Sequence, residues 1–344
     1  MKNIAKILFV VISSLSLMLT AKAGELTVNG SAKATYNATS GQEKDNGLGV
    51  ANELNFTASG EMDNGYSWSY SMELDPSTDD TGAARNDDTQ ISLKMNDFGT
   101  IKLCVSECGS NKKYAFDASA YGAMSDTGLS EGIVYPDDEG SYASLQYHTP
   151  ELPFGTTLSA SHGNQKVDGQ SSNQQVASGD SATFYSAVVK PIDGLTLSGS
   201  YYEKNDYDNG LSNSARQKEE GGAYGAKYAY GNLTVGYGKS FKAPEDDEGT
   251  LTDGATTVEY YENTGLSIGY AVNDDLSVSY TTETGEANYQ TSATTAYDIE
   301  MDSIQVAYSL GGATLSLART DYENIGYANG VDATETIIAL TFAF

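Results

Sequence analysis

Large apolar side chains alternate with small polar ones along most of this chain, and this pattern constrains its fold. In the stretch YSWSYSMEL (66–74), every second side chain is large, with serines or a glutamate between them. A period of two residues predicts β-strands. Sixteen such segments follow one another, from LTVNGSAKATY (26–36) to TIIALTFAF (336–344). The sequence therefore predicts an all-β protein of sixteen strands.

The connections between these segments alternate between short and long. The short ones carry Asn, Asp and Gly, as in Asp63-Asn64-Gly65 and Gly231-Asn232, and these residues tolerate the positive φ angles of tight turns. The long ones are polar and acidic, as in DPSTDDTGAARNDD (75–88). Short turns at one end and long loops at the other are typical of an antiparallel transmembrane β-barrel, with short periplasmic turns and long external loops.

A secreted β-sandwich or adhesin would also alternate, because one face of each sheet lies in a core and the other in water. The predicted polar faces are small and mostly uncharged, as expected for a crowded aqueous lumen. Tyrosines recur near strand ends, where an aromatic girdle would meet lipid headgroups. A closed sheet also satisfies every backbone group inside a bilayer. We therefore favour the barrel and keep the non-channel secreted β-protein as the alternative.

The first 23 residues have the features of a secretory signal peptide. Lys2 and Lys6 precede an apolar run over 7–19, and Ala21-Lys22-Ala23 supplies an A-x-A cleavage site. The run is shorter than the ~20 residues of a membrane-spanning helix. We expect cleavage after Ala23, which leaves 24–344 as one barrel domain without an internal linker.

The chain is strongly acidic, with 19 Lys and Arg against 47 Asp and Glu and a net charge of −28. Loss of the three lysines of the signal peptide makes the mature net charge −31. We do not expect nucleic-acid binding, because it requires basic patches on the protein surface. The two histidines, His148 and His162, have no catalytic motif around them. We therefore expect no enzymatic activity.

The C-terminal segment TETIIALTFAF places Ile338, Leu340, Phe342 and Phe344 on one face of a strand. Between them lie Ala339, Thr341 and Ala343, which are smaller. A strongly apolar strand at the end of the chain is expected if this strand pairs with the first one and closes a barrel in lipid.

Several stretches in order resemble one known family. These are the NGSAKATYNAT start, the hairpin LNFTASGEMDNGYSWSYSMEL, FGTIKL before a long loop, and the terminal phenylalanine. The chain resembles a Gram-negative general porin of the α-proteobacterial type. The resemblance implies a water-filled outer-membrane channel, usually a homotrimer, through which small hydrophilic solutes and ions diffuse passively. The terminal aromatic residue, Phe344, also resembles the signal that the barrel-assembly machinery recognises.

In the porins that this chain resembles, the loop after the fifth strand folds into the lumen and narrows it. Here that loop is CGSNKKYAFDASAYGAMSDTGLSEGIVYPDDEG (108–140). The resemblance implies that its carboxylates face basic residues on the wall. Asp117, Asp126 and Glu131, in the middle of the loop, are the expected acidic side, whereas 137–139 are expected on the way out.

Strand parity predicts the basic side. Where neighbouring apolar residues face lipid, four lysines face the lumen: Lys33, Lys94, Lys102 and Lys227. A charge facing lipid would cost roughly 2–4 kcal/mol at mid-bilayer. The chain has three arginines, so lysines rather than arginines would form this wall. Opposed charges set ion selectivity, and the excess of acid predicts a cation preference.

Two further features of the sequence remain open. Cys104 and Cys108 would be about 13 Å apart in an extended strand, but a bend would let them form a disulfide in an exported protein. The acidic segments ARNDD, PDDEG and PEDDEGTLTDG could bind Ca²⁺, although solvated external loops are favoured and no other metal or cofactor is expected.

A substrate-specific channel remains an alternative to a general pore. Such a channel would need aromatic side chains inside the lumen. Most tyrosines have lipid-facing parity, but Tyr114, Phe116 and Tyr121 in the predicted constriction loop keep this alternative open.

Overall fold

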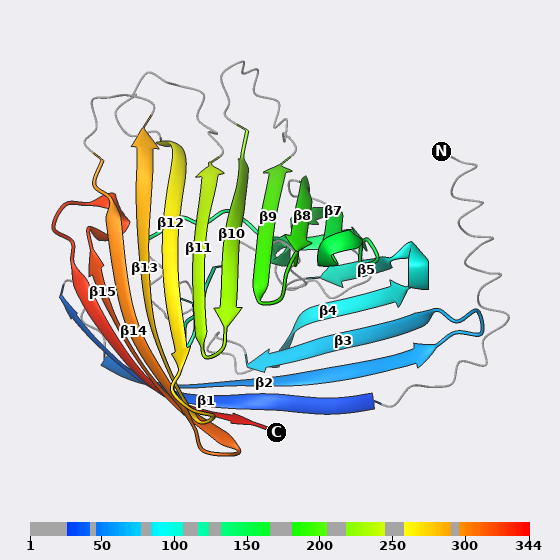
Figure 1. Cartoon of the computed structure of the whole chain (residues 1–344), viewed down its shortest axis with the longest axis horizontal. Coiled ribbons are helices and arrows are strands. Elements are labelled where there is room, and N and C mark those ends of the chain that lie inside the picture. Colours follow the sequence, from blue (N-terminus) through cyan, green and yellow to red (C-terminus); the bar gives the residue numbers. More distant parts are fainter. Residues whose placement is uncertain are drawn as a thin grey trace.

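The structure is a computed structural model of the chain (Figure 1). It describes residues 26–41, 46–76, 84–105, 116–123, 132–165, 181–204, 218–244, 258–289 and 296–344. The predicted signal peptide lies outside these residues. Sixteen antiparallel strands pair in sequence order and close on themselves, because β1 pairs with β16. The predicted all-β barrel is confirmed.

The strands are β1 (Leu26–Gly41), β2 (Asn46–Glu61), β3 (Ser67–Pro76), β4 (Ala84–Lys94), β5 (Thr100–Val105), β6 (Tyr142–His148), β7 (Thr157–Gln165) and β8 (Ser181–Val189). They continue with β9 (Leu195–Lys204), β10 (Glu220–Tyr230), β11 (Leu233–Ala243), β12 (Val258–Ala271), β13 (Leu276–Tyr289), β14 (Ile299–Ser309), β15 (Ala313–Glu323) and β16 (Ala333–Ala343). The described residues also include the short 3₁₀ helices η1 (Asn96–Phe98), η3 (Glu139–Ser141), η4 (Pro153–Gly155) and η6 (Ile325–Tyr327).

The alternation in the sequence becomes two chemically different faces of the barrel. On β14, Ile304 is 61% exposed on the outer face, whereas its neighbours Ser303 and Gln305 are fully buried inside. Cross-strand partners share a face, so Ile304 stands beside Tyr280 of β13, which is also exposed. The apolar outer face suits lipid, and the polar inner face suits water. No helix among the described residues is long and apolar enough to cross a membrane.

Short turns lie at one end of the barrel and long connections at the other, as predicted. Gly65 and Gly194 adopt φ angles of 80° and 78° in two of the short turns, which favours glycine because it has no Cβ. The long connections include the one between β5 and β6, which supplies the candidate site.

Several strands extend further toward the long loops than the sequence pattern predicted. Residues 75–76 of β3 and 84–88 of β4, expected within the long connection 75–88, are strand. Residues 46–49 of β2 and 283–289 of β13 are strand as well. In the extension of β13 the outer face becomes polar, as at Glu286, so the alternation that identifies a lipid-facing strand disappears there, whereas Leu48 keeps the outer face of the β2 extension apolar. The hydrogen-bonded wall therefore rises above its apolar band.

Closure of the barrel runs to the last residue. The backbone N–H of Gly30 donates to the carbonyl of Phe344 (2.8 Å), and the Phe344 N–H donates to Gly30 (3.0 Å). Above them, Ala34 pairs with Leu340. The expectation that the apolar C-terminal strand closes the barrel on the first strand is confirmed.

Candidate functional site: the loop inside the barrel

The connection between β5 and β6 folds into the barrel rather than away from it. Its described parts, 116–123 and 132–138, contact inward-facing side chains of β9–β16. These strands carry many fully buried inward polar residues, whereas no described residue of β1–β3 is buried to that degree. The described parts of the loop therefore lie against the inner faces of β9–β16, and we call the inner face of β1–β5 the open wall. The connection after the fifth strand folds inward as expected, and its role as a constriction stays a prediction.

Residues 118–122 cross three strands and hydrogen-bond with a different strand at each step. The Ala118 N–H donates to Ser267 Oγ on β12 (2.9 Å), and the Ala120 N–H donates to Ser279 Oγ on β13 (2.8 Å). On β14, Gln305 Oε1 accepts from the Tyr121 N–H at 2.8 Å. Polar side chains on the inner wall thus satisfy the backbone of residues 118–122, which form no helix or strand.

Gln305 holds the end of this segment by binding both backbone groups of one residue, Gly122. Its Oε1 also accepts from the Gly122 N–H (3.1 Å), and its Nε2 donates to the Gly122 carbonyl (2.9 Å). A primary amide can do both because it carries two donors and an acceptor.

Glycines on the inner wall make room for Phe116. A Cβ at Gly236 of β11 would collide with the backbone of Phe116, and one at Gly265 of β12 would collide with its ring. The Phe116 ring is 3% exposed. It anchors the loop and is not available to a passing solute, so it does not support the aromatic track that a substrate-specific channel would need.

The returning part of the loop packs on β12–β15. Ile133 joins a buried cluster with Ile299, Met301 and Tyr322. The Tyr135 hydroxyl donates to the carboxylate of Glu283 on β13 (2.8 Å). The loop is therefore fixed by apolar packing as well as by hydrogen bonds.

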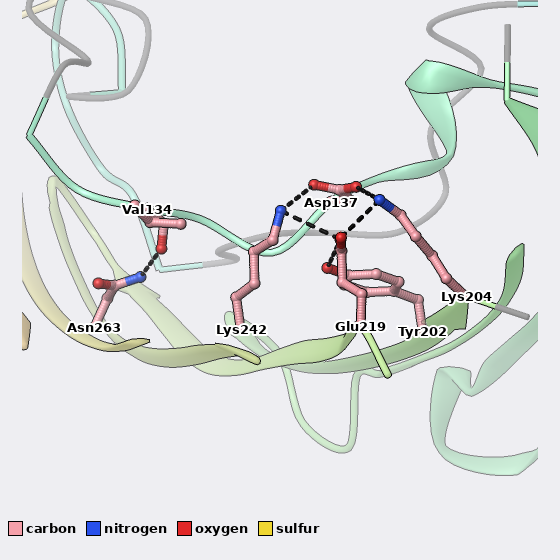
Figure 2. A network of polar contacts seen from close by, with 7 residues as sticks. All are labelled: Val134, Asp137, Tyr202, Lys204, Glu219, Lys242 and Asn263. Carbon is pink, nitrogen blue, oxygen red and sulfur yellow. Dashed lines mark hydrogen bonds and ion pairs between the residues drawn. The ribbon is translucent and has the colours of Figure 1, made fainter. Parts of the chain in front are cut away.

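An ion-pair network ties the loop down before it leaves the lumen (Figure 2). Asp137 accepts from Lys242 Nζ on β11 (2.7 Å) and lies 3.2 Å from Lys204 Nζ on β9. Glu219 completes the network, at 2.7 Å from Lys204 and 3.3 Å from Lys242. The Tyr202 hydroxyl donates to Glu219 (2.9 Å). Two carboxylates and two ammonium groups compensate one another, so these lysines add no net positive charge to the lumen.

Burial alone would raise the pKa of Asp137, but Lys242 and Lys204 more than offset it and hold this pKa below its usual value. Its neighbours in PDDEG also have partners: the Asp138 carboxylate accepts from the Gly140 N–H (3.0 Å), and the Glu139 carboxylate accepts from the Ser161 hydroxyl. Residues 137–139 thus form the exit anchor of the loop.

The four predicted lysines occupy the inward face of their strands. Lys33 has the parity of Asn37, opposite to the exposed Tyr36, and its Nζ lies 5.8 Å from the centre of the Tyr121 ring in the loop. Lys94 and Lys102 share one face with Ser92, which pairs with Lys102 across β4 and β5. Lys227 alternates with the exposed Tyr224 and Tyr228. Their role in a constriction stays a prediction.

The same wall also carries carboxylates that we did not single out from the sequence. On β2, Glu53 and Glu61 share the parity of Thr57, opposite to Leu54 and Phe56. On β3, Glu73 pairs directly with Asn55. The parity rule that found Lys33 would have found them too. The open wall is therefore mixed in charge, not basic.

The predicted acidic side of the constriction is described only in part. The Asp117 carboxylate accepts from the Ser119 N–H (3.2 Å) and hydroxyl (2.5 Å), which fixes it in the docked segment. Asp126 and Glu131 lie outside the described residues.

Cys104, at the end of β5, is buried and disulfide-bonded. Cys108, its predicted partner, lies outside the described residues. In the part of the chain that the structure describes, no three His, Cys, Asp or Glu side chains are arranged to hold a metal ion. Ca²⁺ binding at the acidic loops, one of the two alternatives given by the sequence, stays a prediction.

Comparison with known proteins places this architecture in a family. A family model described as Gram-negative porin matches residues 10–344. The chain belongs to the Gram-negative porin family. Its barrel is an outer-membrane channel for passive diffusion, as the sequence predicted, and the inward loop stands in this porin's lumen. The family and the fold are those of passive channels.

Solved porin structures share the fold of this porin at low sequence identity. A porin refined at 1.8 Å resolution is 16% identical, with a TM-score of 0.64, over 93% of this chain and 100% of that one. OmpF of Salmonella typhi, in complex with daunomycin, is 14% identical (TM-score 0.66; 93% and 98% covered). An anion-selective porin from Comamonas acidovorans is 13% identical, with a TM-score of 0.63, over 93% of this chain and 100% of that one. The comparison with curated proteins finds no match.

Proposed function

We propose that this porin is a general diffusion pore for small hydrophilic solutes, with a preference for cations. The observation that carries the preference is the charge balance of the described inner surface. Lys204 and Lys242 are compensated by Asp137 and Glu219. What remains is the mixed open wall, Asp117 on the loop, and the acidity of the chain, with 47 Asp and Glu against 19 Lys and Arg. Because wall charges set the local concentration of permeant ions, the excess of acid favours cations.

Two features support a general pore rather than an enzyme. His148 faces inward with its Nε2 2.9 Å from Gln146 Oε1, whereas His162 is exposed on the outer face beside Thr183. Histidines on opposite faces of the wall cannot share one active site. A barrel of sixteen strands is also wide enough for an aqueous channel.

The test is conductance of the purified protein in a planar bilayer, with the reversal potential measured in a KCl gradient. Stable steps with a potential that favours K⁺ would support a cation-preferring diffusion pore. Correctly folded protein that gives no steps would contradict the pore, and a potential that favours Cl⁻ would contradict the preference alone.

The lysines of the open wall provide a second test of selectivity. Neutral residues at Lys33, Lys94 and Lys102 together should strengthen the cation preference, because they remove positive charge from the permeation path. The reversal potential of the triple variant measures the effect. An unchanged potential would show that these lysines do not contribute to the constriction.

We infer that the pore assembles as a homotrimer, through the outer face of β1 and β2. Outward residues of these strands carry no charge over the described ranges, and Leu48 and Val50 are 86% and 76% exposed. By contrast, the upper outer face of β14 carries Glu300 and Asp302. An outer face that stays free of charge along the whole strand, as on β1 and β2, suits burial against another subunit.

Cross-linking in mild detergent should give three-subunit species. Leu48→Arg should shift the protein toward the monomer without loss of the folded barrel, whereas Leu48→Ala should leave the trimer intact. Equal behaviour of both variants would place the contact elsewhere.

A further inference from the structure

The open wall of the lumen carries a carboxylate beside the lysine that stands across from the loop. The register pairs Lys33 of β1 with Ala51 of β2, and Ser31 with Glu53. Lys33 and Glu53 are therefore diagonal neighbours on the same inward face, roughly 7–8 Å apart at their backbones.

This pair lies at the height where the loop projects into the lumen. Lys33 Nζ is 5.8 Å from the centre of the Tyr121 ring, and Tyr121 belongs to the segment that is docked through Gln305. Ions that pass the loop on its open side therefore pass both Lys33 and Glu53.

The Glu53 carboxylate is held in place by a neutral side chain. Its Oε1 accepts from Asn55 Nδ2, two residues further along the same face. Asn55 is neutral, so this bond orients the carboxylate but leaves its negative charge. Glu53 is half-buried and still contacts water. Glu73 of β3, opposite Asn55, continues the acidic surface on the next strand.

We infer that Glu53 is a specificity-determining residue of the pore. It offsets Lys33 and gives cations a path along the inner wall of β1–β3, which belongs to the open wall. The inference rests on the proposed diffusion function, and it assigns the cation preference to the wall as well as to the loop.

The experiment compares Glu53→Gln with Glu300→Gln, which removes the same charge from the outer face of β14. Reversal potentials are measured in a KCl gradient near 0.1 M, where the screening length is about 10 Å. A unit charge about 6 Å from a passing ion in water changes its local concentration about threefold. The charge acts on K⁺ and Cl⁻ with opposite sign, so Glu53→Gln should lower the K⁺ to Cl⁻ permeability ratio by up to about tenfold, reduced by screening. Glu300→Gln should leave the ratio near the wild-type value.

Equal K⁺ to Cl⁻ permeability ratios in both variants and the wild type would overturn the inference, but they would not contradict the proposed diffusion pore. Wild-type protein without steps would overturn the proposed function, and the inference with it.

Loss of the bond to Asn55 could impair folding of Glu53→Gln, so a second variant keeps the inference testable. Glu53→Cys is labelled after folding, within the open channel, with a thiol reagent that adds either a sulfonate or a trimethylammonium group. The sulfonate should restore cation preference and the ammonium should reduce it further, whereas the wild type should respond to neither. A labelled channel whose ratio is the same for both reagents would contradict the role of this position.

Discussion

Single residues of the inner wall decide whether the loop can lie where it does. Gly236 and Gly265 leave the space that Phe116 fills, and Gln305 binds both the N–H and the carbonyl of Gly122 in the loop. Neither feature changes the barrel itself. Residue substitutions should therefore separate the shape of the pore from the stability of its wall.

Gly265→Val should displace Phe116 and loosen the loop, at a cost to docking of about 1.5–3 kcal/mol for the lost burial of a large apolar side chain. We expect a folded, heat-modifiable barrel with larger or fluctuating single-channel steps. The matched control is Gly199→Val on the outer face of β9, where a Cβ would lie 3.8 Å from its nearest neighbour. Identical conductance in the two variants would show that Phe116 does not hold the loop.

The exit anchor predicts a pH dependence. Because the pKa of Asp137 is lowered in the folded protein, its stabilising effect is complete above the usual value of an aspartate, about 3.9. It is lost as pH falls through the lower folded value. Channel noise from loop motion should therefore increase in strong acid.

Asp137→Asn should show that noise already at neutral pH, because Lys204 and Lys242 then share a single carboxylate of this network, Glu219. Asp138→Asn, which removes the neighbouring carboxylate but leaves the ion pairs of Asp137 in place, serves as the control. Quiet channels of Asp137→Asn at pH 7 would argue against the anchor.

At the scale of elements, the outer face of the strand extensions has an unusual charge arrangement. Directly opposed carboxylates occur between β12 and β13 (Glu262 and Glu286) and between β14 and β15 (Glu300 and Glu323). Like charges directly across a sheet are destabilising. Lys239 offsets the first pair by binding Glu262, whereas the described residues provide no ion pair for Glu300 or Glu323.

Glu300→Gln should therefore stabilise the barrel at low salt by about 0.2–1 kcal/mol. The gain should shrink as salt screens the repulsion. Glu286→Gln should gain less, because Lys239 already compensates its partner. Thermal unfolding followed on gels at low and high salt measures both, and a destabilised Glu300→Gln would contradict the repulsion.

Period-two alternation was sufficient to predict all sixteen strands, the closure and the inward parity of Lys33. It failed in the extensions, such as 283–289, because a strand with water on its outer face needs no apolar residues there. The path of the loop could not be predicted from local sequence, since Ala118 finds its partner Ser267 149 residues away. Lys204 and Lys242 were missed for a related reason: their partner Asp137 comes from the loop.

For the whole molecule, closure between β1 and β16 is the contact that makes a sheet into a channel. Ser31 and Ala343 are cross-strand partners next to the hydrogen-bonded pair Gly30 and Phe344. They therefore occupy a non-hydrogen-bonded site, where Cα atoms are about 4.5 Å apart, within the range that a disulfide spans.

The double variant Ser31→Cys/Ala343→Cys should form a disulfide across the closure. Without reductant, its folded form should persist on gels to a higher temperature than the wild type, and reductant should abolish the difference. Ser31→Cys alone controls for the native cysteines. Failure to cross-link in the folded protein would contradict the register.

The position of the loop also sets the order in which the protein can be completed. Residues 116–138 are synthesised before the strands that hold them, and their contacts span 105 residues to Lys242 and 184 to Gln305. Contacts this distant form late in folding. The narrow part of the pore therefore cannot exist until the C-terminal half of the wall is in place. A barrel in which the loop has not yet docked would lack the narrow part of the pore and would not select between ions. Ion selectivity in this protein is therefore acquired at the end of its biogenesis.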